Sequence, residues 1–106
     1  MKTFTEQALN VIKKIPPGKV MTYGQVAAAA GSPRAARQVT RILYSMSAKY
    51  NLPWHRIVNT KGMIVLKDED SRLFQKSSLQ EEGVEVDGNN QIDLERFRFD
   101  PELDES

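Results

Sequence analysis

The fold is decided by the stretch TYGQVAAAAGSPRAARQVTRILYSMSA, residues 22–48. Thr22 and Gln25 have the spacing of a capping box, which predicts a short helix over residues 23–30. Gly31 suits the position that ends such a helix, and helical periodicity resumes after it. Two helices joined by a short turn that contains glycine form the helix–turn–helix pattern, which many DNA-binding proteins use.

The second helix of this pair is expected over residues 33–48, with Ser32 as its N-cap and Pro33 in its first position. One side of it collects the apolar residues Ala35, Ala36, Val39, Ile42, Leu43 and Met46, and the opposite side carries Arg34, Arg37 and Arg41. Three arginines on one face are commonly just a solvated surface. Their place after a helix–turn–helix start favours contact with DNA.

Further helices are expected on both sides of this pair. Thr3 and Glu6 form another capping box, and they predict a first helix over residues 4–14, which ends before Pro16. Toward the C-terminus, residues 57–58 and 63–66 flank a turn and predict a small β-hairpin.

A last helix is expected over residues 71–82, with Leu73, Phe74 and Leu79 on its buried side. From about residue 87 the tail is acidic, and its apolar alternation at 92–99 predicts a strand or an extended arm that covers the domain. With 106 residues, 40% of them hydrophobic, we expect a single domain over residues 1–106 that is mainly α with a small β-hairpin.

Charge is distributed unevenly along the chain. Residues 1–67 carry eleven Lys or Arg and one acid, whereas residues 68–106 carry four basic and thirteen acidic residues. This asymmetry indicates either a basic nucleic-acid-binding face or two parts that neutralise each other within one fold.

Composition excludes several classes of site. The chain has no cysteine, which removes disulfides, thiolate ligands and a cysteine nucleophile, and its single histidine, His55, makes a metal site improbable. We therefore expect no metal and no cofactor. No apolar run is long enough to span a bilayer, and no secretory leader is recognisable, so a soluble cytoplasmic protein without a membrane partner is expected.

Four motifs carry a resemblance to a known family. They are Ile15-Pro16-Pro17-Gly18-Lys19-Val20-Met21-Thr22-Tyr23-Gly24, Gly31-Ser32-Pro33-Arg34-Ala35-Ala36-Arg37-Gln38-Val39, Pro53-Trp54-His55-Arg56-Ile57 and Glu82-Gly83. In this order they resemble the C-terminal domain of the O6-alkylguanine-DNA alkyltransferases. The resemblance implies a winged helix–turn–helix-like fold that binds DNA and extrudes the damaged base.

One position departs from the family's pattern. Trp54 stands where the alkyltransferases have their nucleophilic cysteine, so alkyl transfer to a thiolate is impossible. The combination looks like the alkyltransferase-like proteins. It implies a monomeric, non-enzymatic protein that binds O6-alkylguanine in double-stranded DNA and flags it for nucleotide excision repair, associated with the nucleoid if the source is bacterial.

The resemblance also assigns residues to roles. Arg37 would fill the gap left by the flipped base, Tyr23 would rotate its phosphate, and Trp54 would line the lesion pocket. Lys67 stands where the family has a tyrosine near the guanine edge, and a cation there can donate a hydrogen bond to O6. Arg34 and Arg41 would contact phosphates.

His55 and Glu82 match the family's proton relay, and without a thiol we expect them to remain as hydrogen-bonding partners. Arg56 would brace the pocket loop by bonding either carbonyls or an acid. Two alternatives stay open: a residual hydrolase or glycosylase that uses His55 and Glu82, and a helix–turn–helix regulator that reads DNA sequence through its arginines.

Overall fold

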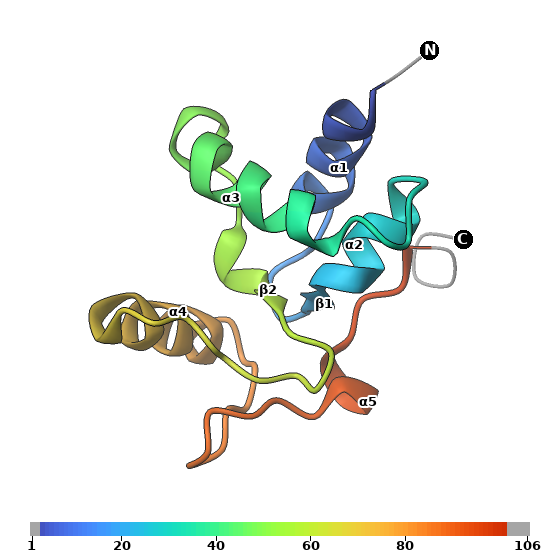
Figure 1. Ribbon diagram of the computed structural model, residues 1–106. Helices are drawn as coiled ribbons and strands as arrows, with labels where there is room; N and C mark the ends of the chain where they lie inside the picture. Colours follow the sequence, from blue (N-terminus) through green and yellow to red (C-terminus); the bar gives the residue numbers. More distant parts are fainter. Residues whose placement is uncertain (1–2, 102–106) are drawn as a thin grey trace.

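The computed structural model describes residues 3–101, and within them the chain is mostly helical. In chain order the elements are α1 (Phe4–Lys13), β1 (Met21–Thr22), α2 (Tyr23–Ala29), α3 (Ala36–Tyr50), the 3₁₀ turn η1 (Trp54–Arg56), β2 (Ile57–Val58), α4 (Glu69–Glu81) and α5 (Leu94–Phe97). Figure 1 shows α1, α2 and α3 grouped on one side of the short sheet and α4 and α5 on the other. The predicted fold, mainly helical with a small sheet, is confirmed.

The Thr22–Gln25 capping box forms as predicted, and at the start of α1 the Thr3 side chain accepts from the Glu6 amide at 3.1 Å. The Thr22 side chain accepts from the Gln25 amide at 3.0 Å, and the Gln25 side chain accepts from the Thr22 amide at 3.0 Å. Gly31 ends α2 with a left-handed φ of 98°, and the amides of Gly31 and Ser32 donate back to Ala28 and Ala27. This double hydrogen bond is a Schellman ending, as expected for glycine.

The start of α3 differs from the prediction. Ser32 does not cap a helix and Pro33 is not its first residue, because α3 begins at Ala36. The Ser32 amide is used to end α2, and its carbonyl accepts from the Ala35 amide at 3.0 Å. Residues 32–35 therefore form a hydrogen-bonded turn, and Arg34 lies before the helix.

The predicted β-hairpin between residues 57–58 and 63–66 is wrong, because residues 57–58 pair with a different segment. β2 pairs in parallel with β1, with Met21 opposite Ile57 and Thr22 opposite Val58. The segment after the turn instead reaches the C-terminal arm, where Met63 bridges Gln91 and the Ile64 amide donates to Asn90. The turn itself forms, because the Asn59 side chain accepts from the amides of Lys61 and Met63 at 3.0 and 2.8 Å.

Two apolar clusters stabilise the two sides of the sheet. The larger packs α1, α2 and α3 around Ile12, Val26 and Val39, all of which are fully buried. The smaller lies beneath α4 and the C-terminal arm and includes Leu79 and Ile92. The described part of the tail folds back over the domain as expected, but it is not extended throughout, because residues 94–97 form the short helix α5.

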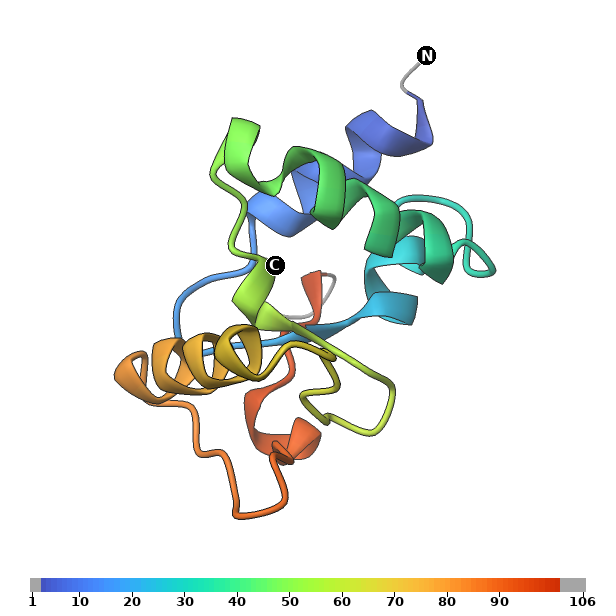
Figure 2. The same ribbon diagram turned by 60° about the vertical axis from the view of Figure 1, so that its left-hand side comes forward.

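Helix α4 turns a different face inward from the one predicted. Leu79 is fully buried as expected, but Leu73 and Phe74 are 58% and 57% exposed, so their predicted burial is wrong. The second buried residue of α4 is polar, Gln75. Figures 1 and 2 both show why: α4 packs along the η1 segment, which lies between it and α3, and no further helix covers its outer side. None of the helices within residues 3–101 is long and apolar enough to cross a membrane.

Candidate nucleic-acid interface and pocket

A pocket of about 440 Å³ opens between α3 and α4. Its lining includes Tyr23, Tyr44, Ser47, Trp54, Lys67 and Gln75. The three residues predicted to line a pocket, Tyr23, Trp54 and Lys67, therefore meet at one cavity although they come from α2, η1 and the loop before α4. Arg34, Arg37 and Arg41 do not line it.

Trp54 enters the pocket from η1, the single turn between α3 and β2. Its ring stacks against Phe74 of α4, with ring centroids 5.7 Å apart and an angle of 22° between planes. Such offset stacking favours a defined ring orientation. Sequence reasoning assigned Phe74 to the core, and only the contact of α4 with η1 shows its place beside the pocket.

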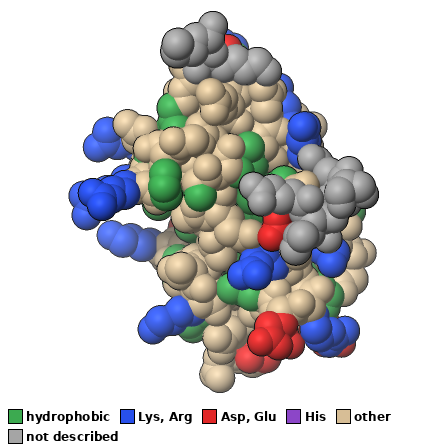
Figure 3. All heavy atoms as spheres, turned by 90° about the vertical axis from the view of Figure 1, so that its right-hand side faces the viewer, with side chains coloured by type: hydrophobic (Ala, Val, Ile, Leu, Met, Phe, Trp, Pro, Cys, Tyr) green, Lys and Arg blue, Asp and Glu red, His purple; other side chains and the backbone are tan. Residues whose placement is uncertain are grey.

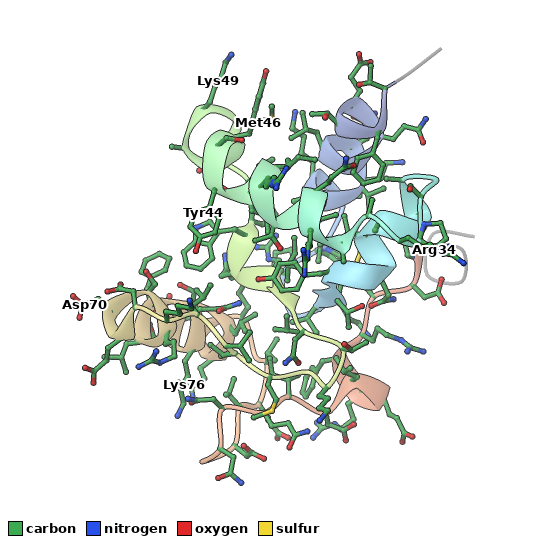
Figure 4. The ribbon with its side chains drawn as sticks, viewed as in Figure 1. Arg34, Tyr44, Met46, Lys49, Asp70 and Lys76 are labelled. Carbon is green, nitrogen blue, oxygen red and sulfur yellow. The ribbon has the colours of Figure 1, made fainter. Side chains whose placement is uncertain are left out.

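Tyr44 is a pocket residue that the sequence analysis missed. It is 83% exposed, and Figure 4 shows it on the side of α3 that faces α4, well away from Arg34. A signal for it exists, since Tyr44 follows Arg37 and Arg41 at helical spacing and so shares their side of α3. Base-sized aromatic surface next to a basic face is typical of nucleic-acid-binding proteins.

Tyr23 occupies the first position of α2, directly after the Thr22 cap. Burial, and then the nearby Tyr44, raises the pKa of the Tyr23 phenol above its usual value of 10.0. The hydroxyl is therefore protonated at neutral pH and can donate a hydrogen bond to a phosphate or a base.

The three predicted arginines are exposed along the start of α3. Arg37 and Arg41 lie in its first two turns, Arg34 lies in the turn before it, and among residues 3–101 no acid forms an ion pair with any of them. Figure 3 shows several Lys and Arg side chains projecting along the left-hand edge of the molecule, with others elsewhere on this face, while most of the visible Asp and Glu side chains lie near its base.

A network of hydrogen bonds lies next to Trp54 in the chain and consists of His55, Arg56 and Glu82. Glu82 accepts from Arg56 Nε at 3.0 Å and from Arg56 Nη2 at 2.6 Å, and its Oε2 lies 3.0 Å from His55 Nε2. Arg56 also donates to the Ile15 carbonyl at 2.8 Å, so it bonds both an acid and a carbonyl. The Arg56 hydrogen bonds, followed by that from His55, lower the pKa of Glu82 from 4.5 to about 2. The network therefore connects η1 to two other segments: the residue that follows α4, Glu82, and the loop that follows α1, at Ile15.

Within the part of the chain that the structure describes, no group of three or more His, Cys, Asp or Glu side chains is arranged to hold a metal ion.

Comparison with known proteins places this chain in a family of DNA-binding proteins. The sequence profile of the 6-O-methylguanine DNA methyltransferase, DNA binding domain, matches residues 3–84. A DNA base-flipping protein of Escherichia coli is 46% identical over 97 residues, which cover 92% of this chain and 74% of that protein. Alkyltransferase-like protein 1 of Schizosaccharomyces pombe is 34% identical over 106 residues, covering 95% and 98% respectively.

The same likeness appears in three dimensions. The crystal structure of S. pombe Atl1 in complex with damaged DNA containing O6-carboxymethylguanine matches with a TM-score of 0.83 at 33% identity, covering 95% of this chain and 100% of that one. Since the profile spans most of the chain and these relatives align along nearly all of it, the chain belongs to the family of the 6-O-methylguanine DNA methyltransferase DNA-binding domain and, within it, to the alkyltransferase-like proteins.

Proposed function

We propose that this protein binds double-stranded DNA that contains O6-alkylguanine, flips the damaged base into the α3–α4 pocket, and transfers no alkyl group. The observation that carries the proposal is the meeting of Tyr23, Trp54 and Lys67 at one cavity beside an exposed arginine face. The relatives named as base-flipping and alkyltransferase-like proteins support it.

The energetics are favourable for selective binding. Extruding a base costs a few kcal/mol, and less when a lesion already weakens its pairing. Stacking on an aromatic ring contributes roughly 1–3 kcal/mol per base, which is comparable. Trp54, held by Phe74, offers such a surface in a pocket of about 440 Å³. A lesion that flips more easily therefore binds preferentially without any chemical step.

Each polar residue has a proposed part in this binding. Arg37 fills the vacated stack, because a planar guanidinium stacks and hydrogen-bonds the orphaned base at once. Tyr23 turns the phosphate of the flipped nucleotide, and Arg34 and Arg41 bind neighbouring phosphates. Lys67 donates a hydrogen bond near O6 of the guanine.

The His55–Glu82 pair supports a structural role and not a residual enzyme. A carboxylate with a pKa of about 2 is a weak general base, and Arg56 already occupies both of its oxygens. The 106 residues contain no cysteine to accept an alkyl group. Incubation with a labelled O6-methylguanine oligonucleotide should release no base and form no guanine, and either product would support the enzyme alternative.

We further propose that the protein acts as a monomer in the cytoplasm, on the nucleoid if bacterial, and hands the lesion to nucleotide excision repair proteins. A protein that binds a lesion without removing it needs a separate activity to repair it. Analytical ultracentrifugation with and without damaged duplex tests the monomer. Reconstituted incision of a single-lesion duplex, with and without the protein, tests the hand-over.

The central experiment compares two duplexes that differ at one base. One carries O6-methylguanine and the other guanine at the same position, and binding is titrated at several salt concentrations. We expect tighter binding to the damaged duplex at every concentration, because the pocket contributes only when a base enters it. Equal affinities throughout would overturn the proposal.

A further inference from the structure

One buried polar side chain near the pocket has no role so far. Gln75 of α4 is only 2% exposed and lines the pocket. Its Nε2 donates to two backbone carbonyls, those of His55 and Ile57, each at 3.0 Å. These two carbonyls lie on either side of Arg56, at the junction of η1 and β2.

The chemistry of these contacts leaves the Gln75 amide a single orientation. A primary amide has one nitrogen with two N–H donors and one oxygen that only accepts. Both partners are carbonyls, which can only accept, so the nitrogen must face them and both of its hydrogens are used. Buried carbonyls that lose their donors are costly. The amide therefore acts as a two-point clamp on the backbone.

The clamp holds the turn that carries Trp54. η1 is a single turn of three residues without a side-chain cap, so little within it determines its position. Glu82 contacts the side chains of His55 and Arg56, whereas Gln75 contacts the backbone itself. Phe74, the ring that stacks on Trp54, is the neighbour of Gln75 in the chain. Two neighbouring residues of α4 thus hold the backbone that directly follows Trp54, at His55 and Ile57, and one face of the Trp54 ring.

We propose that Gln75 is the positioning residue of the pocket, because its amide sets where Trp54 stands relative to an incoming base. This inference rests on the proposed function only for the measurement of DNA affinity. The position of the Trp54 ring is measurable without DNA, since Trp54 is the one tryptophan of the chain and its fluorescence reports that site alone.

The test replaces Gln75 with methionine, which has a similar length but cannot donate. The matched control is Gln80→Met, the same substitution at an exposed position of the same helix. Three quantities are measured for each: the urea midpoint, the quenching of Trp54 by acrylamide, and the affinities for duplexes with O6-methylguanine or guanine at one position.

For Gln75→Met we expect stronger quenching of Trp54 and a loss of lesion preference of about tenfold, which lies within what one aromatic stacking contact contributes to base binding. Affinity for the undamaged duplex should stay unchanged, because the arginines of α3 lie elsewhere. Gln80→Met should match the wild type in all three. A merely structural role would lower the urea midpoint and leave the quenching and the lesion preference of the folded protein unchanged, and that result would overturn the proposal.

The two proposals fail in different ways. If the wild type itself shows no lesion preference, the proposed function is wrong, and the quenching of Trp54 still decides whether Gln75 positions it. If Gln75→Met does not fold, Gln75→Asn replaces it. Asparagine keeps the amide but is one methylene shorter, so it reaches one carbonyl at most, and its Trp54 quenching should fall between those of the wild type and a fully released turn. Quenching identical to the wild type in the asparagine variant would also overturn the positioning role.

Discussion

Arg56 holds Glu82 with two parallel hydrogen bonds, from Nε to Oε1 at 3.0 Å and from Nη2 to Oε2 at 2.6 Å. Paired guanidinium–carboxylate bonds of this kind fix orientation as well as distance. Since Arg56 belongs to η1 and Glu82 immediately follows α4, the pair connects the turn that carries Trp54 to the end of α4. The measurable consequence of this pair is its effect on stability.

The first prediction concerns pH. The pKa of Glu82 is lowered from 4.5 to about 2 in the folded protein, so its stabilising effect is fully present above pH 4.5 and is lost as the pH falls toward 2. Glu82→Gln should therefore flatten the acid limb of the stability curve. Urea midpoints at about pH 6 and about pH 3 measure this, with exposed Glu81→Gln as the control. An acid limb as steep in Glu82→Gln as in the wild type would contradict the prediction.

The second prediction concerns Gly62, which has a φ of 78° and would place an added Cβ 2.5 Å from the Ile92 carbonyl oxygen. Gly62→Ala should lower the free energy of unfolding by roughly 1–3 kcal/mol, because it combines backbone strain with a collision against backbone. Gly83→Ala has a positive φ but nothing within 4 Å, and Gly88→Ala has neither problem. Chemical denaturation should rank Gly62 as most affected, Gly83 next and Gly88 least, and any other order would contradict this reasoning.

How far the sequence predicted the fold depended on the range of the interactions. The Thr22–Gln25 capping box and the Gly31 helix end rest on residues a few positions apart, and both predictions are confirmed. The partner of β2 is distant in the chain, and a local turn at Asn59 favoured the wrong hairpin. Local patterns cannot reveal which distant segment offers a better partner.

The candidate site shows the same division. Tyr23, Trp54 and Lys67 were named through family resemblance, and their roles stay predictions although they share one pocket. Gln75 and Phe74 were missed or misplaced because periodicity alone expects apolar residues of α4 to face inward. The inward position goes to Gln75, whose amide donates to the carbonyls of His55 in η1 and Ile57 in β2, and an apolar side chain could not donate to either.

The third prediction concerns the C-terminal arm. Phe99 is 4% exposed within the larger apolar cluster, and its amide donates to the Val20 carbonyl at 2.7 Å. Phe99→Ala should cost about 3–5 kcal/mol of folding free energy, the usual effect of emptying a buried aromatic site. Denaturation of this variant beside exposed Arg98→Ala provides the comparison. Equal midpoints would mean that the arm contributes little, and removal of residues 87–106 would then leave the domain folded.

The fourth prediction concerns salt. If Arg41 binds a phosphate, Arg41→Ala should weaken binding to damaged and undamaged duplexes equally and reduce the slope of log affinity against log salt by about 1. Arg98→Ala removes the same charge from the C-terminal arm and should change neither quantity. A loss confined to the damaged duplex would instead place Arg41 at the lesion.

The last prediction separates the aromatic surface of the pocket from the basic face. Trp54→Ala should remove about 1–3 kcal/mol of preference for O6-methylguanine and leave the affinity for undamaged duplex intact, because stacking contributes only when a base is flipped. Trp54→Phe keeps an aromatic ring beside Phe74 and should retain part of the preference. Paired titrations of the two duplexes at one salt concentration measure the difference for each variant. If alanine and phenylalanine were equally damaging, the indole would act through its shape or its N–H and not through stacking; if neither had an effect, the base would bind elsewhere.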